Sequence, residues 1–398
     1  MTWQTKPISD VFAVVGGGTP SKKRPEYYGG EIPWATIRDM HSSELATTEH
    51  TITEEGLQAS SAKVIPAGEV IMASRVGLGK ACLLNQSTAI NQDIRALLPK
   101  HRDAIDRRFC LYWLQSIEDV IIGAGSGATV QGVKLPFIKA LPFPDVGLEE
   151  QKRIVAVLDQ AFAALDRARA LAEANLADAE ELFERIRSTL LQRLSVEAPT
   201  EKMGALVAFL NGDRGKNYPN KSEYVPYGIS WINTGHIKPD GTLADEKMNF
   251  ITQAKFDQLG GGKTRNGDIV FCLRGATIGK TALVGRHVPG AVASSLMIIR
   301  PSAKVIDKFV YYFLTSELGK NEIERFIGGA AQPNLAGKSV GQFNVPIVSI
   351  EKQIELVGQL DKARTNCSRL AEELAGKIAD LADLRQSLLQ KAFTGELT

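Results

Sequence analysis

PFPDVGLEEQKRIVAVLDQ, residues 142–160, and NVPIVSIEKQIELVGQLDK, residues 344–362, are two copies of the stretch that decides the fold of this chain. Each copy joins a short proline-containing run to a segment with acidic residues, a shared glutamine and apolar residues at helical spacing. Self-similarity at a fixed displacement is the signature of a repeated structural unit. We therefore predict two copies of one architecture, each ending in a helix.

Three further pairs of segments repeat in the same order, displaced by roughly 200 residues. They are IPWATIRDM from Ile32 and ISWINTGHI from Ile229, AGEVIMASRVGLGK (Ala67–Lys80) and NGDIVFCLRGATIGK (Asn266–Lys280), and STLLQRL from Ser188 and QSLLQKAF from Gln386. One such match can arise by chance. Several matches in register indicate an internal repeat.

The last part of each copy predicts a long helix. Residues 149–194 contain neither glycine nor proline, and in this segment and in 350–393 apolar residues recur at spacings of three, four and seven, a coiled-coil pattern. Ser349 is placed to cap the second helix at its start, and Gly395 is placed to cap its end. The expected coiled-coil core is Leu158, Leu165, Ala172, Ala179 and Ile186 in the first helix and Leu360, Leu370, Leu374, Leu381 and Leu388 in the second.

A helix of this length is on the order of 65 Å long, and its apolar stripe needs a partner. Because the termini of a domain usually lie close together at the surface, we expect the second helix to run back antiparallel to the first. The other copy then supplies the partner for each helix.

The part of each copy that precedes the helix predicts a mixed domain. EVIMAS and DIVFCL are expected to be buried strands, while RRFCLYWLQS and DKFVYYFLTSEL are expected to be amphipathic helices. The predicted fold class is α+β, with two similar domains containing mixed sheets, joined by two long helices in an antiparallel coiled coil, as a pseudo-twofold internal repeat. The predicted boundaries are 1–147 and 199–348 for the domains, and 148–198 and 349–398 for the helices.

Composition narrows the class of protein. The length of 398 residues is enough for two or three domains. The composition, 44% hydrophobic and 23% charged, is usual for globular proteins. No apolar run approaches the roughly 20 residues of a membrane span, and the N-terminus lacks the features of a signal peptide. The four cysteines are far apart, which favours free thiols in a reducing cytoplasm. A net charge of +2 neither indicates nor excludes a nucleic-acid binder, because a local basic face is enough.

The motifs that resemble catalytic sites are poor matches. GATIGKT (Gly275–Thr281) has three residues between its glycines where a phosphate-binding loop needs four. Asp145 and Glu150 are too close in sequence for the separate strands of a nuclease metal site, and acidic residues in a first helical turn explain them better. The histidines show no metal-ligand spacing. The sequence therefore favours recognition over catalysis, with no metal site and no cofactor in this chain.

Two similar domains held at a fixed separation suit the recognition of two half-sites on duplex DNA, as dimeric DNA-binding proteins do. A coiled-coil scaffold that binds no nucleic acid is the alternative at this point.

Several segments resemble the type I restriction-modification specificity (S) subunits, the HsdS family. They are GGGTPSKKRPEYYGGEIPWATIRDM (Gly16–Met40), SRVGLGK, LRGATIGK, INQDIRAL (Ile90–Leu97), LEEQKRIVAVLD and LLQKAFTGEL (Leu388–Leu397). The resemblance spans nearly the whole chain. The second copy departs from it, with SIEKQIELV in place of LEEQKRIV and a different domain opening at Leu210–Ile232.

The resemblance implies a non-catalytic, cytoplasmic subunit in which each domain is a target-recognition domain for one half of an asymmetric bipartite target in double-stranded DNA. It implies that the helices set the spacer and dock two methyltransferase (M) subunits, and that endonuclease-translocase (R) subunits join the complex. S-adenosylmethionine, ATP and Mg are then expected on the partner subunits. The specificity subunit of a related bifunctional restriction enzyme remains a further alternative.

DNA-contacting residues are expected in the polar, glycine-rich loops, with lysines and arginines on phosphates and arginines on guanine edges. Arg75 and Arg274 end equivalent strands and are the expected base contacts. Trp34 and Trp231 occupy matching strand positions, which favours core packing over base stacking. The full set of predicted DNA-binding residues is Lys22, Lys23, Arg24, Tyr27, Arg75, Lys80, Arg214, Lys216, Asn217, Lys221, Arg274 and Lys280.

Overall fold

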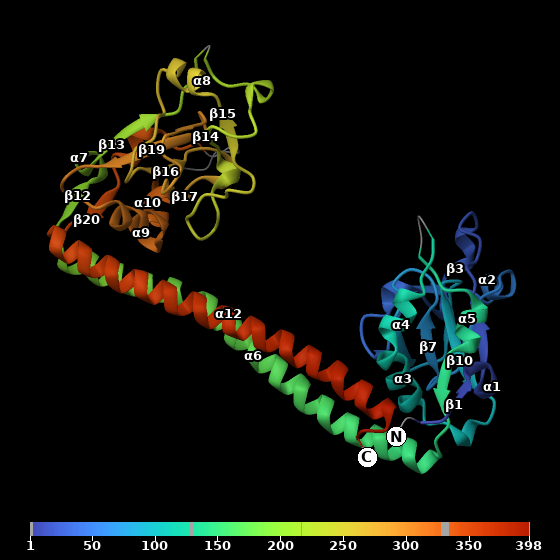
Figure 1. The fold of residues 1–398 in the computed structure, drawn as a ribbon. Helices are drawn as coiled ribbons and strands as arrows, with labels where there is room; N and C mark the ends of the chain where they lie inside the picture. Colours follow the sequence, from blue (N-terminus) through green and yellow to red (C-terminus); the bar gives the residue numbers. More distant parts are fainter. Residues whose placement is uncertain (1–2, 128–130, 216, 328–333, 398) are drawn as a thin grey trace. The chain divides into compact units, whose positions relative to one another are not determined.

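The computed structural model describes residues 3–127, 131–215, 217–327 and 334–397. The chain divides into two compact units, one formed by Met1–Glu173 with Ala375–Thr398 and the other by Ala174–Leu374. Two long helices, α6 (Leu148–Glu197) and α12 (Ile350–Thr394), each contribute a segment to both units (Figure 1). Each unit therefore contains one α+β domain and two helix segments.

The first unit is built on two main sheets. A five-stranded sheet has the order β2-β10-β7-β8-β4 and a four-stranded sheet the order β5-β3-β9-β6. Parallel pairs, β3 with β9 and β4 with β8, lie among antiparallel ones, so the sheets are mixed. The strands are β1 Thr5–Pro7, β2 Phe12–Gly16, β3 Tyr28–Ala35, β4 Glu44–Leu45, β5 His50–Ile52, β6 Lys63–Ile65, β7 Val70–Ala73, β8 Ala81–Leu84, β9 Thr88–Ile90, β10 Ile94–Pro99 and β11 Pro142–Pro144, with helices α1 Ile8–Val11, α2 Glu54–Gln58, α3 Arg107–Ser116, α4 Glu118–Gly123 and α5 Leu135–Ala140.

The second unit repeats this plan with fewer strands. Its sheets have the orders β13-β19-β16-β17 and β15-β14-β18, the latter with β14 parallel to β18. A two-stranded sheet beside the start of α12 pairs β12 with β20, as β1 pairs with β11 in the first unit. The elements are β12 Thr200–Lys202, α7 Met203–Leu206, β13 Val207–Asn211, β14 Ile229–Ile232, β15 Asn249–Ile251, α8 Gln253–Gln258, β16 Ile269–Cys272, β17 Thr281–Leu283, β18 Gly290–Val292, β19 Leu296–Pro301, α9 Asp307–Thr315, α10 Glu317–Ile327, α11 Gly337–Val340 and β20 Asn344–Pro346.

The predicted strands and helices of the two domains are confirmed. EVIMAS and DIVFCL form β7 and β16, whose residues are all buried. The two aromatic segments form α3 and α9, but they are not simply amphipathic. Every residue of 109–114 in α3 and of 309–314 in α9 is buried, because the sheet and the long helices together surround these turns.

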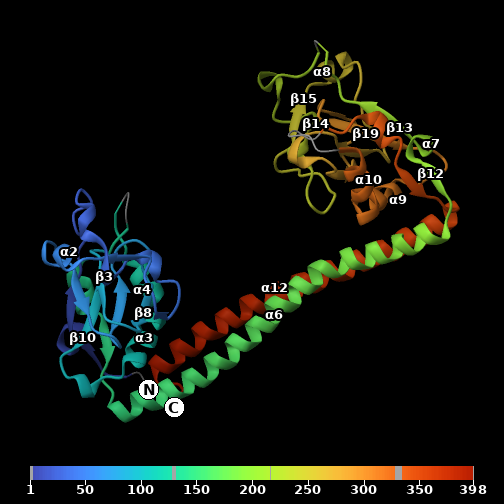
Figure 2. The same cartoon turned by 180° about the vertical axis from the view of Figure 1, so that it is seen from behind.

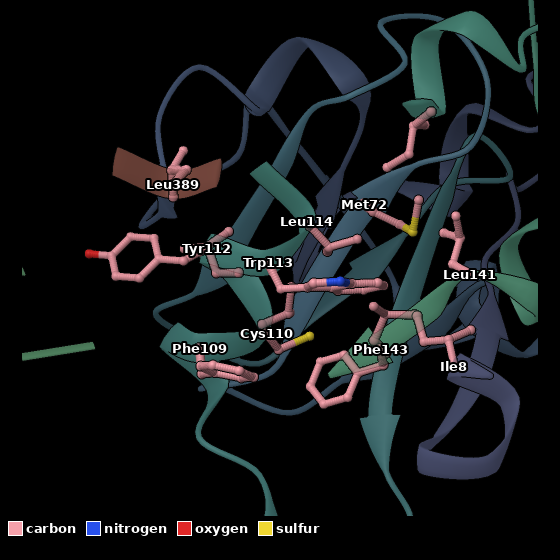
Figure 3. Packing of buried hydrophobic residues seen from close by; sticks show 14 of the residues in the cluster. Ile8, Met72, Phe109, Cys110, Tyr112, Trp113, Leu114, Leu141, Phe143 and Leu389 are labelled. Atoms are coloured by element: carbon pink, nitrogen blue, oxygen red, sulfur yellow. The ribbon is translucent and has the colours of Figure 1, made fainter. Parts of the chain in front are cut away.

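The core of the first unit shows how the domain is joined to the helices (Figure 3). The Trp113 ring of α3 packs edge-on against Phe143 of β11, with the ring centroids 5.0 Å apart. Leu389 of α12 belongs to the same buried cluster and lies at its edge in Figure 3. The domain therefore shares its core with the second long helix.

Within each unit the segments of α6 and α12 lie side by side in both views (Figures 1 and 2). In the first unit, early residues of α6 share a cluster with late residues of α12, and Asp166 pairs with Arg385 at 2.8 Å. In the second unit, late residues of α6 such as Leu190 pack with early residues of α12 such as Leu360. The antiparallel pairing is thus confirmed within each unit.

Most predicted core residues of the helices are buried or half-buried, but the prediction that Leu370 lies in the coiled-coil core is wrong. Its side chain is 41% exposed, whereas Cys367, three residues earlier, is 7% exposed. Buried or half-buried positions in α12 recur at Leu360, Cys367, Leu374, Leu381 and Leu388, a strict seven-residue spacing. Leu370 lies outside this column of positions. Its apolar side chain alone is therefore not enough to place it in the core. Leu158, Ala172, Ala179, Leu360 and Leu374 are buried, and Leu165, Ile186, Leu381 and Leu388 are half-buried.

Truncation of two leucines in the same helix tests this assignment. We expect Leu374→Ala to lower the free energy of unfolding by about 2 kcal/mol, because a buried side chain is lost. Leu370→Ala removes the same atoms from an exposed position and should cost less than about 0.5 kcal/mol. Urea unfolding followed by circular dichroism measures both. Equal losses would place Leu370 in the core after all.

The termini of α12 match their predicted caps. The Lys352 amide lies 3.5 Å from the Ser349 hydroxyl, and Glu351 occupies the first turn. Gly395 has a φ of 82°, and the Glu396 amide donates to the Lys391 carbonyl at 2.9 Å, closing the last turn.

One buried glutamine in each unit holds the domain to the start of a long helix. The Gln151 side chain donates to the carbonyls of Ala104 (3.1 Å) and Val146 (2.9 Å) and accepts from the Asp106 amide (2.8 Å). Gln353 makes the same three contacts, to the Lys304 and Val348 carbonyls and from the Ile306 amide. This is the glutamine shared by the two repeated stretches.

A buried tyrosine repeats in the same way. Tyr112 of α3 and Asp159 of α6 are hydrogen-bonded, and Arg108 pairs with the same carboxylate at 2.9 Å. In the second unit Tyr312 donates to Asp361 at 2.6 Å, and Lys308 pairs with Asp361 at 2.5 Å. Burial raises the pKa of both phenols above its usual value.

The four cysteines, Cys82, Cys110, Cys272 and Cys367, are buried with free thiols. Burial raises the pKa of the Cys82 thiol to about 12 and that of Cys110 as well. Among the described helices, none is both long and apolar enough to cross a bilayer.

Candidate nucleic-acid interface

The two predicted base-contacting arginines occupy the same place in the two units. Arg75 follows β7 and Arg274 follows β16. The amide before each arginine donates to an equivalent carbonyl, Ser74 to Asp93 (2.7 Å) and Leu273 to Ser295 (3.1 Å). Each arginine also forms a β-bridge to a later segment, at Gly132 and Asn334 respectively. The backbone therefore presents both arginines from the same frame.

The Arg75 side chain is oriented but accessible. It is 51% exposed and lies 3.6 Å from the Asp93 carboxylate. Asp93 is in turn held by the side-chain amides of Asn91 (3.2 Å) and Gln92 (3.3 Å). An arginine held on one side by a carboxylate keeps other N–H donors for a ligand. This geometry suits bidentate contact with a guanine edge.

A pocket of about 650 Å³ opens beside this loop. It combines aromatic rings, amides and cations, which are the groups that contact bases and phosphates. Its lining is Thr19, Lys22, Tyr28, Trp34, Thr36, Ile37, Arg38, His50, Val76, Asn91, Gln92 and Asp93.

The glycine-rich loop that carries the predicted lysines is anchored below its tip. A Cβ at Gly17 would lie 2.0 Å from the Ile90 carbonyl oxygen, so only glycine fits there. The Trp34 indole donates to the Gly18 carbonyl (3.1 Å) and the Tyr28 hydroxyl to that of Pro20 (2.6 Å). The loop therefore presents its basic tip from a fixed base.

The predicted DNA-binding residues of this tip differ in their exposure and in their ion pairs. Lys22, Lys23 and Arg24 are all exposed, but Arg24 pairs with Glu26 at 3.0 Å. Tyr27 is half-buried, and its carbonyl accepts from the Thr53 amide (3.0 Å). Of these four residues, only Lys22 is among the described residues that line the pocket.

The corresponding loop of the second unit is built differently. The Asp213 carboxylate accepts from the amides of Gly215 (2.7 Å) and Gly260 (2.8 Å), and these bonds lower its pKa. Arg214 is exposed and reaches the Ser294 carbonyl at 3.4 Å, and the Asn217 side-chain amide donates to the Gln258 carbonyl at 2.7 Å. Lys221 is exposed at the start of a short 3-10 helix, and Lys216 lies outside the described residues.

Lys80 and Lys280 are exposed in the turns that connect β7 to β8 and β16 to β17. Each lines a hollow of its own unit, of about 430 Å³ and 630 Å³ respectively. The hollow at Lys280 also contains Lys238, Lys320 and the buried Arg187, whose guanidinium donates to the Thr315 carbonyl at 2.7 Å. Both lysines lie in turns between strands and face solvent.

The two tryptophans are buried, Trp34 at 5% and Trp231 at 1% exposure. Tyr218 packs edge-on against Trp231 with centroids 5.3 Å apart, as Tyr28 packs against Trp34 at 5.9 Å. Core packing therefore accounts for both rings, although Trp34 also forms part of the pocket wall.

The structure adds residues that sequence reasoning missed. Arg38, Asn91, Gln92 and Asp93 line the pocket with Lys22 and lie around the Arg75 loop. The segment INQDIRAL was a signal for three of them, because its polar residues interrupt a buried strand pair. Nothing in the sequence pointed to Arg38. Among the described residues, no group of three or more His, Cys, Asp or Glu side chains is placed to hold a metal ion.

Comparisons with known proteins agree with this duplicated architecture. The family model described as the type I restriction modification DNA specificity domain matches residues 1–175 and 206–378. The specificity subunit of type I restriction enzyme MjaIX from Methanocaldococcus jannaschii is 30% identical over 39% of this chain and 37% of its own length. The EcoKI specificity subunit of Escherichia coli K12 is 21% identical over 100% of this chain and 89% of its own length.

The chain thus spans less than half the length of the first relatives it matches, while more distant relatives align almost throughout. Two solved structures share the fold. A chain from a study of complex assembly and conformational transition of the type I R-M system has a TM-score of 0.73 at 18% identity, covering 99% of this chain and 98% of that one. The HsdS subunit of Thermoanaerobacter tengcongensis has a TM-score of 0.61 at 20% identity, covering 99% and 97%. On the match to both of its halves, this chain belongs to the family of type I restriction modification DNA specificity domains.

Proposed function

We propose that this chain is the DNA sequence-specificity subunit of a type I restriction-modification complex. Each domain recognises one half of an asymmetric bipartite target in double-stranded DNA, through Arg75 and its surrounding loops in the first domain and Arg274 in the second. The observation that carries the proposal is the family match in both halves, combined with arginines on the same backbone frame in each.

The long helices set the spacer in this proposal. Helix α6 begins in the first unit and ends in the second, and we expect its length to set the separation of the two half-sites. Inserting one helical turn into α6 and α12 should change the preferred spacer while leaving both half-site sequences unaltered.

Catalysis belongs to partner chains in this proposal. The helices and their flanking surfaces dock two methyltransferase subunits, and endonuclease-translocase subunits complete the cytoplasmic complex. S-adenosylmethionine, ATP and Mg are then bound by those partners. Support comes from the family membership and from the many exposed charges on the outer faces of α6 and α12, which a partner surface can complement.

Selection from a randomised duplex pool tests the proposal. The full chain should enrich a two-part consensus with a constant gap, and its affinity should fall steeply with salt concentration because phosphate contacts release counterions. Purified chain should neither methylate nor cut this DNA. Salt-independent binding, or no enriched sequence, would contradict the proposal and favour a scaffold. Methylation or cleavage by the chain alone would favour a bifunctional enzyme.

A further inference from the structure

The loop after β7 contains a residue in an unfavourable conformation. Val76 has a φ of 51°, which lies in the left-handed region. Among the described residues it is the only non-glycine residue with a positive φ. This region is poor for any L-residue and worst for β-branched ones, whose Cβ crowds the backbone. The backbone conformation at this position therefore does not explain why the residue is a valine.

The second unit shows what the backbone prefers at this position. Val76 follows Arg75 as Gly275 follows Arg274, and the two loops share the hydrogen-bond frame described above. Gly275 has a φ of 71°, and a Cβ built there would meet nothing within 4 Å. The positive φ alone therefore explains why residue 275 is a glycine. The first unit has a valine at the equivalent position, where the backbone conformation also suits glycine.

Packing does not explain the valine either. Its side chain is 49% exposed, so it adds little to the core. It lines the pocket of about 650 Å³ and also a second hollow of about 910 Å³ that contains Lys80. Ile37 and Arg38 line both as well, so the two hollows share these three residues in their walls.

The chemistry of this shared wall points to one kind of contact. Valine cannot hydrogen-bond a phosphate or a base edge. The C5 methyl group of thymine is the apolar feature of the major-groove edge of a base pair, and small apolar side chains contact it. Arg75, the adjacent residue, has the donors for a guanine edge, while Lys22, Arg38 and Lys80 supply cations around it.

We propose that Val76 is a specificity-determining residue that recognises a thymine methyl group in the half-site of the first domain. The inference rests on the proposed function, since it assigns a base contact to the same interface. Gly275 has no side chain, so the second domain makes no such contact from this position. The contact accounts for a β-branched residue being present in a left-handed loop.

Selection from a randomised duplex pool by the full chain and by its Val76→Gly variant tests this. The unaltered chain should enrich a thymine at a position where Val76→Gly shows no preference. Replacing that thymine by deoxyuridine, which lacks only the methyl group, should weaken binding by the unaltered chain roughly fourfold and leave the variant unaffected.

A thermal melt separates this role from a structural one. Glycine suits the left-handed backbone, so Val76→Gly should melt at the same temperature as the unaltered chain or higher. Val64→Gly is the matched control, because Val64 is 42% exposed in β6 and glycine weakens a strand. The control should melt lower and keep the consensus.

The outcomes distinguish the two proposals. A consensus and a deoxyuridine response that are identical in Val76→Gly and the unaltered chain would overturn the assignment of Val76 alone. A melting temperature lowered as far as in the control would also overturn it, because Val76 would then be structural. If the unaltered chain enriches no sequence, the proposed function fails and this inference fails with it.

Discussion

Gln151→Ala should lower the free energy of unfolding of the first unit by about 2–3 kcal/mol, the largest effect on stability that we expect from one polar side chain. The substitution removes a side chain that is 1% exposed and leaves the Asp106 amide and the Ala104 and Val146 carbonyls without a partner in three partly buried hydrogen bonds. Each unsatisfied buried group costs about 1–3 kcal/mol. The Asp106 carboxylate also caps α3 by accepting from the Phe109 amide at 3.0 Å, so the loss spreads to that helix.

The measurement is urea unfolding combined with hydrogen exchange at the Asp106 and Phe109 amides, whose protection should fall. Gln160→Ala, at an exposed position of the same helix, is the control and should change stability little. Gln353→Ala should reproduce the effect in the second unit, at the Ile306 amide. If Gln151→Ala unfolds like the control, the hydrogen bonds do not join domain and helix as described.

Arg75→Ala should weaken binding of the cognate duplex by about 10–100-fold, because a bidentate contact to a base contributes about 1–3 kcal/mol of discrimination. The loss should be confined to one position of the half-site recognised by the first domain. Arg274→Ala should act on the other half-site alone. Competition binding with duplexes mutated one base pair at a time provides the measurement.

Arg75→Lys distinguishes a base contact from a phosphate contact. Lysine keeps the charge but lacks the planar fork of donors, so affinity for nonspecific DNA should be retained while base preference is lost. Arg169→Ala is the control, since Arg169 is exposed on α6 and paired with Glu173 at 2.8 Å. Full recovery of specificity by lysine would show that Arg75 contacts only a phosphate.

The first domain should depend on Asp93 for this selectivity. Asp93 lies beside Arg75, and its carbonyl accepts from the Ser74 and Arg75 amides. The second domain has Ser295 at the equivalent position and lacks a carboxylate there. The two domains therefore present different side chains on one backbone plan, which suits an asymmetric target.

The sequence by itself determined the repeated plan of this protein. Helix and strand periodicities are local, so the long helices, the buried strands β7 and β16, and their order in two copies follow from residues close together in the chain. The shared glutamine was visible as part of the repeat, but its three hydrogen bonds were not, because its partners lie up to 49 residues away.

Only the tertiary structure decided which apolar and polar residues face one another. Leu370 matches the helical pattern as well as Leu374 does, yet the rotation of α12 against its partner leaves it outside the seam. The side chains around Arg75 come from the loop at Asn91–Asp93, brought together by the pairing of β10 with β7. The left-handed φ of Val76 is not predicted by its own residue type, which favours the opposite conformation, and only the surrounding loop imposes it.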